Sequence, residues 1–174
     1  MTTTADSLAR LPVGVWQVDT ESSELGFRAR GLFGLANVKG QFGRFSGALT
    51  VTDEHTHGKL TVAAATLDTQ NAKRDEHLRS ADFFDTAEYP EFEFELTSLK
   101  RVRAGELEAA GVLRIRDNEL SIHAPVEASV TRNHLTLATR ISVDRAAAGF
   151  GWNKMGMIKG KAHLHAKVRL TKQI

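Results

Sequence analysis

The densest group of titratable side chains lies in one short stretch of the sequence. The group consists of Arg74, Asp75, His77, Arg79, Asp82 and Asp85. A carboxylate beside an imidazole can work as a general acid–base pair, so Asp75 and His77 are the residues that a hydrolase or isomerase would use here. No Ser or Thr nucleophile stands in a recognisable elbow, and structural ion-pair networks gather the same residue types. The stretch therefore favours a network that braces a helical turn, with acid–base catalysis as the alternative.

Two pairs of histidines could bind a metal ion. His55 and His57, and His163 and His165, have the two-residue spacing that places both imidazoles on one face of a strand. Two His with a third ligand can build an open zinc site. However, His163 and His165 share their face with Lys167, which would repel a cation, and a His-x-His motif alone is a weak signal. We expect no metal and no cofactor.

The composition excludes several other kinds of chemistry. The 174 residues include no Cys, which rules out disulfides, thiolate zinc sites, iron–sulfur clusters and cysteine nucleophiles. There are 23 Lys and Arg against 21 Asp and Glu, a net charge of +2, with no run of basic residues that would grip a phosphate backbone. The glycine spacings match no phosphate-binding loop. We expect no nucleic-acid partner.

The aromatic residues are strongly biased toward Phe. The chain has 9 Phe, 2 Trp and 1 Tyr. A buried Phe needs no hydrogen-bond partner, whereas buried Tyr and Trp usually do. The bias therefore predicts a dry interior, which could be either a plain core or a cavity that faces a lipid.

Alternation of apolar and polar residues dominates the chain and predicts antiparallel strands. The clearest runs are 92–97, 113–116, 120–124, 135–141 and 162–170, and less regular runs are 16–19, 24–30, 38–52 and 59–67. Eight or nine strands at this spacing are typical of a closed up-and-down barrel, which hides its edges. An interior of that size is filled by side chains or holds one small ligand.

Two kinds of connection interrupt these strands. Asp117-Asn118 and Arg132-Asn133 read as tight hairpin turns, because Asn tolerates a positive φ. Residues 71–84 have helix-like spacing and predict one or two short helical turns that end before Tyr89-Pro90.

The segment from 145 to 161 combines four Gly with large apolar side chains. Such side chains are unusual on a loop, because loops lie on the surface. The segment could fold back as a plug or act as a lid over an apolar pocket, with Phe150 and Trp152 among its side chains. A third interpretation is a filled barrel that serves as a protein-interaction module, with residues 150–158 as the contact patch.

The ends of the chain predict one domain. Residues 1–12 read as a disordered tail, and 13–174 as a single barrel domain. The N-terminal residues have no positive start followed by an apolar stretch, so no secretory signal of the usual kind is present. No apolar run is long enough to span a bilayer, so we expect no stable membrane insertion. With the absence of Cys, these features predict a cytoplasmic protein.

Several motifs together resemble the YceI-like family. The first are Trp16-Gln-Val-Asp19, Ser23-Glu-Leu-Gly-Phe27 and Val38-Lys-Gly40-Gln-Phe42. The most specific is the central string from Arg74 to Phe92, RDEHLRSADFFDTAEYPEF, and Gly111-Val-Leu113 and Val143-Asp-Arg145 match more weakly. The resemblance covers about Val13 to Val168. The chain departs from the family pattern at Ser22 and near Arg30, where the family often has His, and at Ala148, where it usually has Phe.

The resemblance implies a lipocalin-like, eight-stranded antiparallel barrel with a short helical insert. Members of the family are described as binding polyisoprenoid chains or similar lipids inside the barrel. Under this resemblance, a cluster at the barrel rim would brace the insert and pack it inward; its residues are Arg74, Asp75, His77, Phe83 and Phe84.

These observations lead to one main functional hypothesis. We expect a non-enzymatic binding or carrier protein for a long apolar chain, an isoprenoid or fatty-chain lipid, and a homodimer is one assembly that it could form. The strand registers predict the ligand-binding residues Phe27, Phe42, Phe92, Phe94, Leu113, Ile115, Phe150 and Trp152. The alternatives are a hydrolase or isomerase that uses Asp75 and His77, and the filled-barrel interaction module.

Overall fold

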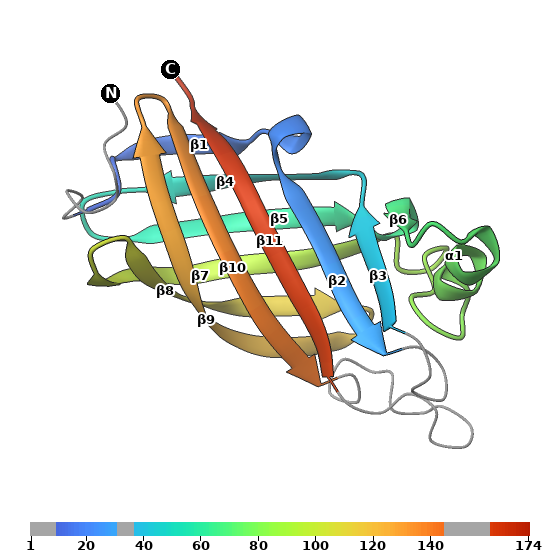
Figure 1. Ribbon diagram of the computed structural model, residues 1–174. Helices are drawn as coiled ribbons and strands as arrows, with labels where there is room; N and C mark the ends of the chain where they lie inside the picture. The colour runs from blue at the N-terminus through green and yellow to red at the C-terminus, as the bar shows by residue number, and fades with distance from the viewer. Residues whose placement is uncertain (1–9, 31–36, 145–160) are drawn as a thin grey trace.

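The computed structural model describes residues 10–30, 37–144 and 161–174, and most of these lie in antiparallel strands (Figure 1). Its elements in chain order are β1 (Gly14–Val18), η2 (Thr20–Ser22), β2 (Glu24–Arg30), β3 (Asn37–Phe42), β4 (Phe45–Val51), β5 (Thr56–Ala63), η4 (Ala64–Thr66), β6 (Leu67–Asp68), α1 (Ala72–Arg79), β7 (Glu91–Arg103), β8 (Glu106–Ile115), β9 (Asn118–Thr131), β10 (His134–Asp144) and β11 (Lys161–Lys172). The predicted segments 145–161 and 150–158, with Phe150 and Trp152, lie outside the described residues, apart from Lys161.

Eight of the described strands form a closed ring. Their order is β1-β4-β5-β7-β8-β9-β10-β11, and the ring closes because Trp16 of β1 pairs with Lys172 of β11. All of the strand pairs are antiparallel. The predicted eight-stranded antiparallel barrel with a short helical insert is therefore confirmed.

The strands of the first third of the chain are broken into two pieces each. β11 pairs with β1 near its end and with β2 near its start, so β1 and β2 continue one another around a corner at η2. β3 pairs with the other edge of β2, and β6 pairs with β3. As a result, β2 and β3 run beside β10 and β11, while β1, β4, β5 and β7 cross them at a steep angle (Figure 1).

Hydroxyl groups hold the two corners. At the first corner, Ser23 Oγ donates to the carbonyl of Asp19 (2.6 Å) and accepts the N–H of Arg169 (2.9 Å). At the second, Thr66 Oγ1 accepts the N–H groups of Gly43 (3.2 Å) and Arg44 (3.1 Å). These bonds supply partners for backbone groups that the interrupted sheet does not pair.

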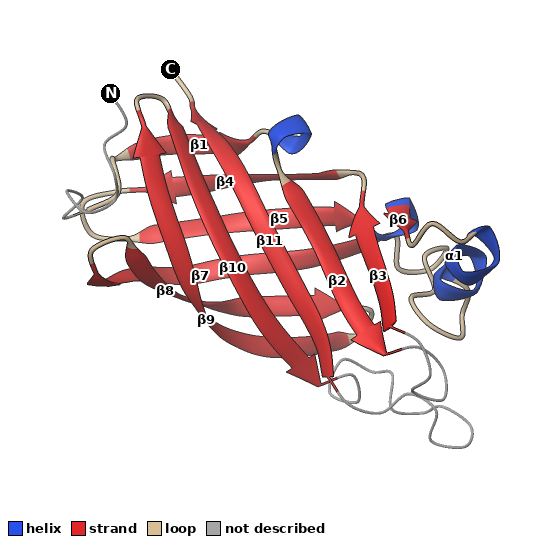
Figure 2. Ribbon diagram, viewed as in Figure 1, coloured by secondary structure: helices blue, strands red, loops and turns tan. Residues whose placement is uncertain are grey.

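The insert between β6 and β7 lies beside the free edge of β6, where the described sheet ends (Figure 2). β6 pairs with β3, and no described strand pairs with its other edge. α1 lies beside β6 at this point (Figure 2). It begins at Asn71, whose side chain accepts the N–H of Arg74 (3.0 Å) as an N-cap. The predicted helical segment 71–84 is thus confirmed as one short helix followed by turns.

β9 changes its partner halfway along its length. It pairs with β8 over its first part, up to Glu127, but with β10 only from Glu127 to Thr131. Pro125 has no N–H to offer to β10. Instead, Thr139 Oγ1 of β10 donates to the Pro125 carbonyl (2.8 Å). Figure 1 shows β9 bending from the layer of β8 toward β10, so the two layers part beyond this point.

Both predicted hairpins exist, but the positive φ angles are not at the Asn residues. They occur at Arg116 (φ 55°) and Arg132 (φ 46°), each the first residue of its two-residue turn. A tight hairpin needs a left-handed residue at that position, whichever side chain the register places there. Asn118 and Asn133 are therefore not the residues that adopt it.

Candidate binding site

Side chains alternate between the interior and the exterior of the barrel along every long strand. On β9, for example, Ala124, Val126, Ala128 and Val130 are buried, and the residues between them are exposed. The same alternation on β11 points Leu164, Ala166 and Val168 inward and exposes His163 and Lys167.

One end of the barrel is filled. Its core consists of Trp16, Leu49, Val51, Leu96, Leu107, Ala109, Val126, Ala128, Val130, Leu135 and Leu170. Trp16 and Leu135 are 0% exposed, and the indole Nε1 of Trp16 donates to the carbonyl of Pro12 (3.1 Å). Leu11 also packs against this core. Leu11 and Pro12 fall within the predicted tail 1–12, yet both contact the barrel.

The other end encloses a hollow. A cavity of about 360 Å³ runs through this half and is lined almost wholly by apolar side chains from both layers. Leu60, Leu113, Ile122 and Leu164 point inward and are only half-buried, because they border this empty space. The cavity reaches the end where β2 and β10 finish and β3 and β11 begin, which we call the mouth end: Ala29, Val143 and Ala162 line it there. A filled barrel, as the interaction-module hypothesis required, is therefore not what the described residues form.

Six of the eight residues predicted to bind a ligand line this cavity. They are Phe27, Phe42, Phe92, Phe94, Leu113 and Ile115. Four aromatic rings form a chain of contacts along the wall: ring centres are 5.7 Å apart for Phe27 and Phe42, 5.6 Å for Phe42 and Phe92, and 5.0 Å for Phe92 and Phe84.

Two glycines let these rings lie close to the wall. The ring of Phe27 covers Gly40 on the adjacent strand so closely that a Cβ at Gly40 would overlap it. The ring of Phe94 covers Gly111 in the same way, 2.7 Å from where a Cβ would stand. The rings therefore leave the centre of the cavity open.

Aliphatic residues complete the wall, and sequence reasoning did not select them. They include Leu25, Leu60, Val62, Ile122, Leu137, Ile141, Leu164, Ala166 and Val168. Most of them occupy the apolar positions of the alternating runs. The alternation of apolar and polar residues could therefore have identified them as well. The predicted set was biased toward Phe.

The cluster around α1 has a buried carboxylate at its centre. Asp75 is 6% exposed, and its Oδ1 accepts both the backbone N–H (3.0 Å) and the hydroxyl of Thr69, which is also buried. Arg74 donates from Nε to Thr69 Oγ1 (2.9 Å) and from Nη2 to the Thr69 carbonyl (2.8 Å). Asp75 and Arg74 thus tie the helix to the end of β6.

His77 has a different partner. Its Nε2 lies 3.1 Å from Asp82 Oδ2, and both side chains are about half-exposed. Its ring packs edge-on against Phe83, with centres 4.9 Å apart. Asp75 and His77 are therefore not joined as the acid–base pair that the hydrolase or isomerase alternative needs.

The rest of the insert is anchored to the barrel. Arg79 donates to the carbonyls of Ala65 (2.9 Å) and Leu67 (3.1 Å). Arg116, in the β8–β9 turn, donates to the Phe83 carbonyl (2.8 Å) and lies over the ring of Tyr89. A hydrogen bond to the Asp117 carboxylate raises the pKa of Tyr89. The contacts of Arg79 and Arg116 hold the insert against the barrel, where Phe83 and Phe84 form part of the cavity wall.

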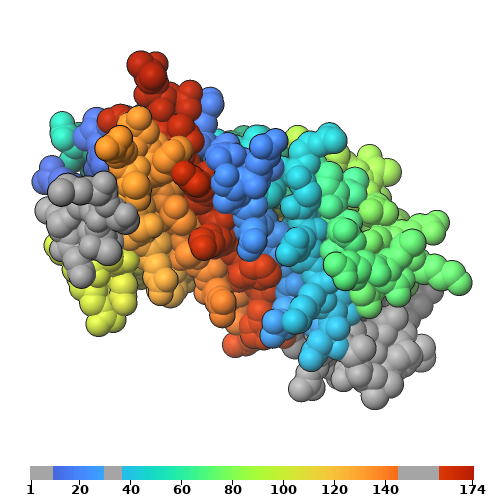
Figure 3. Space-filling model, turned by 45° about the horizontal axis from the view of Figure 1, so that its top comes forward, coloured from blue at the N-terminus to red at the C-terminus, as the bar shows by residue number. Residues whose placement is uncertain are grey.

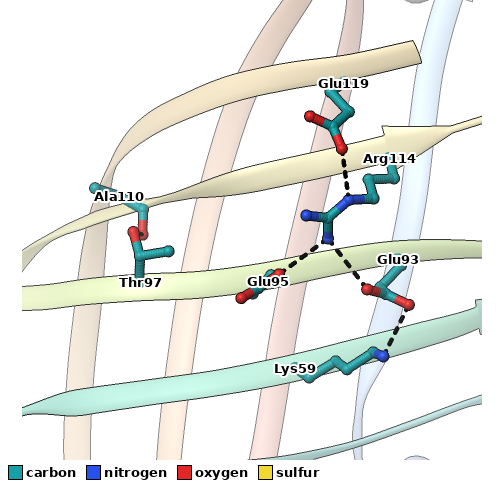
Figure 4. Close-up of polar contacts among 7 residues, drawn as sticks. All are labelled: Lys59, Glu93, Glu95, Thr97, Ala110, Arg114 and Glu119. Atoms are coloured by element: carbon teal, nitrogen blue, oxygen red, sulfur yellow. Dashed lines mark hydrogen bonds and ion pairs between the residues drawn. The ribbon is translucent and has the colours of Figure 1, made fainter. Parts of the chain in front are cut away.

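The outer face of β5, β7 and β8 carries a ladder of ion pairs (Figure 4). Glu93 pairs with Lys59 (2.9 Å) and Arg114 (3.1 Å), and Arg114 also pairs with Glu95 (3.0 Å) and Glu119 (2.9 Å). The Lys59 ammonium, followed by Arg114, lowers the pKa of Glu93, and Glu119 and Glu95 raise the pKa of Arg114. Lys59 and Glu93 border the cavity through their backbone, while their charges stay outside.

Other parts of the described chain offer less to a ligand. A smaller hollow of about 220 Å³ at the filled end is lined by many charged side chains, including Arg10, Asp53 and Glu54. Within 10–30, 37–144 and 161–174, no three His, Cys, Asp or Glu residues lie together as metal ligands would. Nor does that part of the chain contain a helix that is long and apolar enough to cross a membrane.

Comparison with known protein families gives a match over most of the chain. The model of the YceI-like domain matches residues 16–170, which include the insert and all eight ring strands except the first two residues of β1 and the last two of β11. The chain belongs to the YceI-like domain family. The predicted family is thus confirmed.

Two curated members of the family show the extent of the sequence similarity. A UPF0312 protein of Photorhabdus laumondii is 37% identical over 98 residues, which cover 52% of this chain and 50% of that protein. Protein YceI of Escherichia coli O157:H7 is 34% identical over 105 residues, which cover 58% and 54%. The chain spans about half the length of the curated relatives it matches.

Solved structures of similar shape show the same fold at low sequence identity. BcnA of Burkholderia cenocepacia superposes with a TM-score of 0.78 at 16% identity, covering 87% of this chain and 98% of that one. A YceI protein of Campylobacter jejuni gives 0.72 at 19% identity, covering 80% and 88%. A domain of Saccharophagus degradans, described as a polyisoprenoid binding domain implicated in plant cell wall breakdown, gives 0.75 at 11% identity, covering 93% and 100%.

Proposed function

We propose that this protein is a non-enzymatic binding or carrier protein that holds a long apolar chain, an isoprenoid-type lipid, inside the barrel. The observation that carries the proposal is the apolar cavity of about 360 Å³. Cavities of roughly 300–1,000 Å³ with apolar walls are typical of small-molecule sites. Inward-facing residues that stay half-exposed, such as Leu113 and Leu164, are the surface that a ligand would cover.

The lining favours a ligand without a polar body. A buried polar group needs a hydrogen-bond partner, and the middle of this wall offers little beyond the Thr139 hydroxyl, which already donates to Pro125. Apolar burial contributes about 25 cal/mol per Å², so a hydrocarbon chain gains affinity from contact area alone. The aromatic rings of Phe27, Phe42 and Phe92 add large, flat contact surfaces for a branched chain.

The comparisons support the choice of lipid. The domain of Saccharophagus degradans that shares this fold is described as binding polyisoprenoids, and the chain belongs to the same broad structural group. A non-enzymatic role agrees with the separate partners of Asp75 and His77, because the pair that the hydrolase or isomerase alternative names is not joined.

The proposal is tested by native mass spectrometry of the purified protein, followed by extraction and identification of any lipid that leaves with it. We expect an adduct with the mass of an isoprenoid-type lipid, and rebinding of added farnesol or geranylgeraniol to the delipidated protein. If repeated preparations contain only the apo mass and added prenyl alcohols do not bind, the proposal is wrong.

A pair of variants assigns the binding to the cavity. Ala166→Trp places a large ring inside the barrel, because Ala166 lines the cavity from β11. Lys167→Trp adds the same ring at the next residue, on the exposed outer face. We expect Ala166→Trp to lose prenyl alcohol binding and Lys167→Trp to keep it. Equal binding by both variants would place the ligand elsewhere.

A further inference from the structure

The outside of the barrel is unevenly charged. Among the side chains that the structure describes, the strands β10, β11, β2 and β3 carry seven Lys and Arg against two acidic residues, Glu24 and Asp144. The strands β7, β8 and β9 carry four Lys and Arg against seven Glu. Because the net charge of the whole chain is only +2, one side of the molecule is basic and the other is acidic.

The basic side chains lie next to one another across the strands. Register places Arg28 between His163 on β11 and Lys39 on β3. We define the basic face as the exposed residues Arg28, Lys39, Arg140, Lys161, His163 and Lys167. Like charges directly opposite each other in a sheet destabilise it, so the fold gains nothing from this arrangement.

The basic face also lacks the compensation found elsewhere on the barrel. Arg114 on β8 pairs with three carboxylates. In contrast, among the residues that the structure describes, the Lys and Arg of the basic face form no ion pair, and Glu24 lies opposite Lys167 without bonding to it. These cations remain available to an external anion.

The position of the basic face connects it with the cavity. Arg28, Lys39 and His163 are two residues from the strand ends at Arg30, Asn37 and Lys161, which mark the mouth end. On the inner side of the same strands, Ala29 and Ala162 line the cavity. Figure 3 shows β10, β11, β2 and β3 forming one continuous surface.

We propose that the basic face binds the anionic surface of a phospholipid membrane and so brings the mouth end of the cavity against the lipids. The inference rests on the proposed function, since it names where an apolar chain would be exchanged. A single-stranded nucleic acid is favoured less, because such ligands stack on exposed aromatic rings and no Phe, Trp or Tyr is exposed in the described part of this face. Clustered Lys and Arg beside one end of an apolar cavity match a charged surface with an apolar interior.

The test is sedimentation of the full chain with vesicles. Vesicles of phosphatidylglycerol with phosphatidylcholine are compared with vesicles of phosphatidylcholine alone, at low and at high salt. We expect binding to the anionic vesicles only, and its loss at 1 M salt, where the screening length falls to about 3 Å. Binding to both kinds of vesicle alike, or to neither, would overturn the inference.

Charge reversal locates the surface. Each cation near an anionic membrane contributes about fivefold to partitioning, so R28E/K39E should bind at least about twenty-five times more weakly. The control R101E/R132E makes the same change in net charge at exposed residues of the filled end and should bind like the unaltered protein. Equal losses in both variants would show attraction by net charge alone, and so would contradict the inference.

A second measurement separates this inference from the proposed function. Binding of geranylgeraniol in solution, without vesicles, is measured for the unaltered protein and for R28E/K39E, whose cavity is unchanged. We expect equal affinities. If the unaltered protein does not bind geranylgeraniol but vesicle binding is lost in R28E/K39E, the proposed function is wrong. If it binds geranylgeraniol but R28E/K39E binds vesicles as well as the unaltered protein does, the inference about the membrane is wrong. Retention of R28E/K39E on anionic vesicles, or binding to heparin without any binding to vesicles, would also refute it.

Discussion

Asp75 is the residue on which the insert depends most. It is a buried carboxylate, and burial of a charge is unfavourable unless several hydrogen bonds compensate for it. Thr69 provides two donors to Asp75, and Arg74 in turn donates to Thr69, so the charge is stabilised through a connected network. The network joins the start of α1 to the end of β6 and therefore fixes the insert beside the edge of β6 that no described strand pairs with.

We predict that Asp75→Ala lowers the free energy of unfolding by about 2 kcal/mol or more, because each buried donor that it leaves without a partner costs about 1–3 kcal/mol. Urea denaturation measures the loss. Asp82→Ala is the control: Asp82 is exposed and pairs only with the exposed His77, so we expect a change of about 1 kcal/mol or less. Equal losses in the two variants would contradict the structural role given to Asp75.

At the scale of single residues, the sequence predicted which aromatic side chains line the cavity, but it did not predict the hydrogen-bond partners of the polar brace. Phe27, Phe92 and Phe94 face the cavity because alternation determines the face of each residue once the strand is known. The partners of Asp75 could not be read in the same way. Its nearest candidate in the sequence was His77, but two residues along a helix lie on different sides, and the true partner, Thr69, precedes the helix.

The ion-pair ladder belongs to the scale of elements, because it links four neighbouring strands on their outer face. Lys59, Glu93, Arg114 and Glu119 come from β5, β7, β8 and β9. Exposed pairs of this kind are individually weak, but a shared Arg114 joins them into a network. The ladder lies on the outer side of strands whose inner residues Leu60, Phe94 and Leu113 line the cavity.

We predict that the ladder makes stability depend on pH through Glu93. The Lys59 ammonium and Arg114 hold the pKa of Glu93 below its usual range. Its contribution to stability is therefore complete above the pKa of the unfolded state and is lost as the pH falls through the lower folded pKa. Urea titrations should show Glu93→Gln less stable than the unaltered protein at neutral pH, with the difference disappearing in acid.

Glu127→Gln is the control for this titration. Glu127 is exposed on β9 and forms no ion pair with any described residue. The substitution should change stability equally little at neutral and acid pH. A difference for Glu93→Gln that persists unchanged into acid would show that the ladder contributes nothing through ionisation.

At the scale of elements, alternation predicted the strands but not where they break. The run 38–52 is continuous in its apolar pattern, yet it forms β3 and β4 with a corner at Gly43 and Arg44. The corner depends on the distant Thr66 hydroxyl, which no local pattern reveals. β9 stops pairing with β10 near Pro125, which has no N–H to donate. The sequence shows the Pro, but it does not show which neighbouring strand loses the hydrogen bonds.

The whole molecule combines a rigid half with a hollow half. The filled end, around Trp16 and Leu135, supplies a compact core. In the cavity half, the wall residues pack against one another around Leu25, Phe45 and Phe92, but they lack the contacts toward the empty centre that side chains supply in a filled core. A ligand that completes those contacts would stabilise the folded state without any change of fold.

The homodimer and the cytoplasmic location stay predictions.

We predict that prenyl alcohols raise the melting temperature of the delipidated protein. A ligand at about one hundred times its Kd adds about 2.7 kcal/mol, which corresponds to a rise of roughly 5–10 °C for a domain of this size. Thermal denaturation followed by circular dichroism measures the shift for geraniol, farnesol and geranylgeraniol. The shift should grow with chain length until the cavity is full. No shift with any chain, or an equal shift in Ala166→Trp, would count against binding in the barrel.

The glycines beneath the aromatic rings have a consequence for how such barrels could diversify. Gly40 and Gly111 let the rings of Phe27 and Phe94 rest on the backbone of the next strand. One added methyl group at Gly40 would overlap the ring of Phe27, and at Gly111 it would also meet the backbone carbonyl of Glu95, so either substitution would require the wall to shift. The space inside such a barrel can thus change through one substitution in its wall, with every side chain that lines the cavity kept.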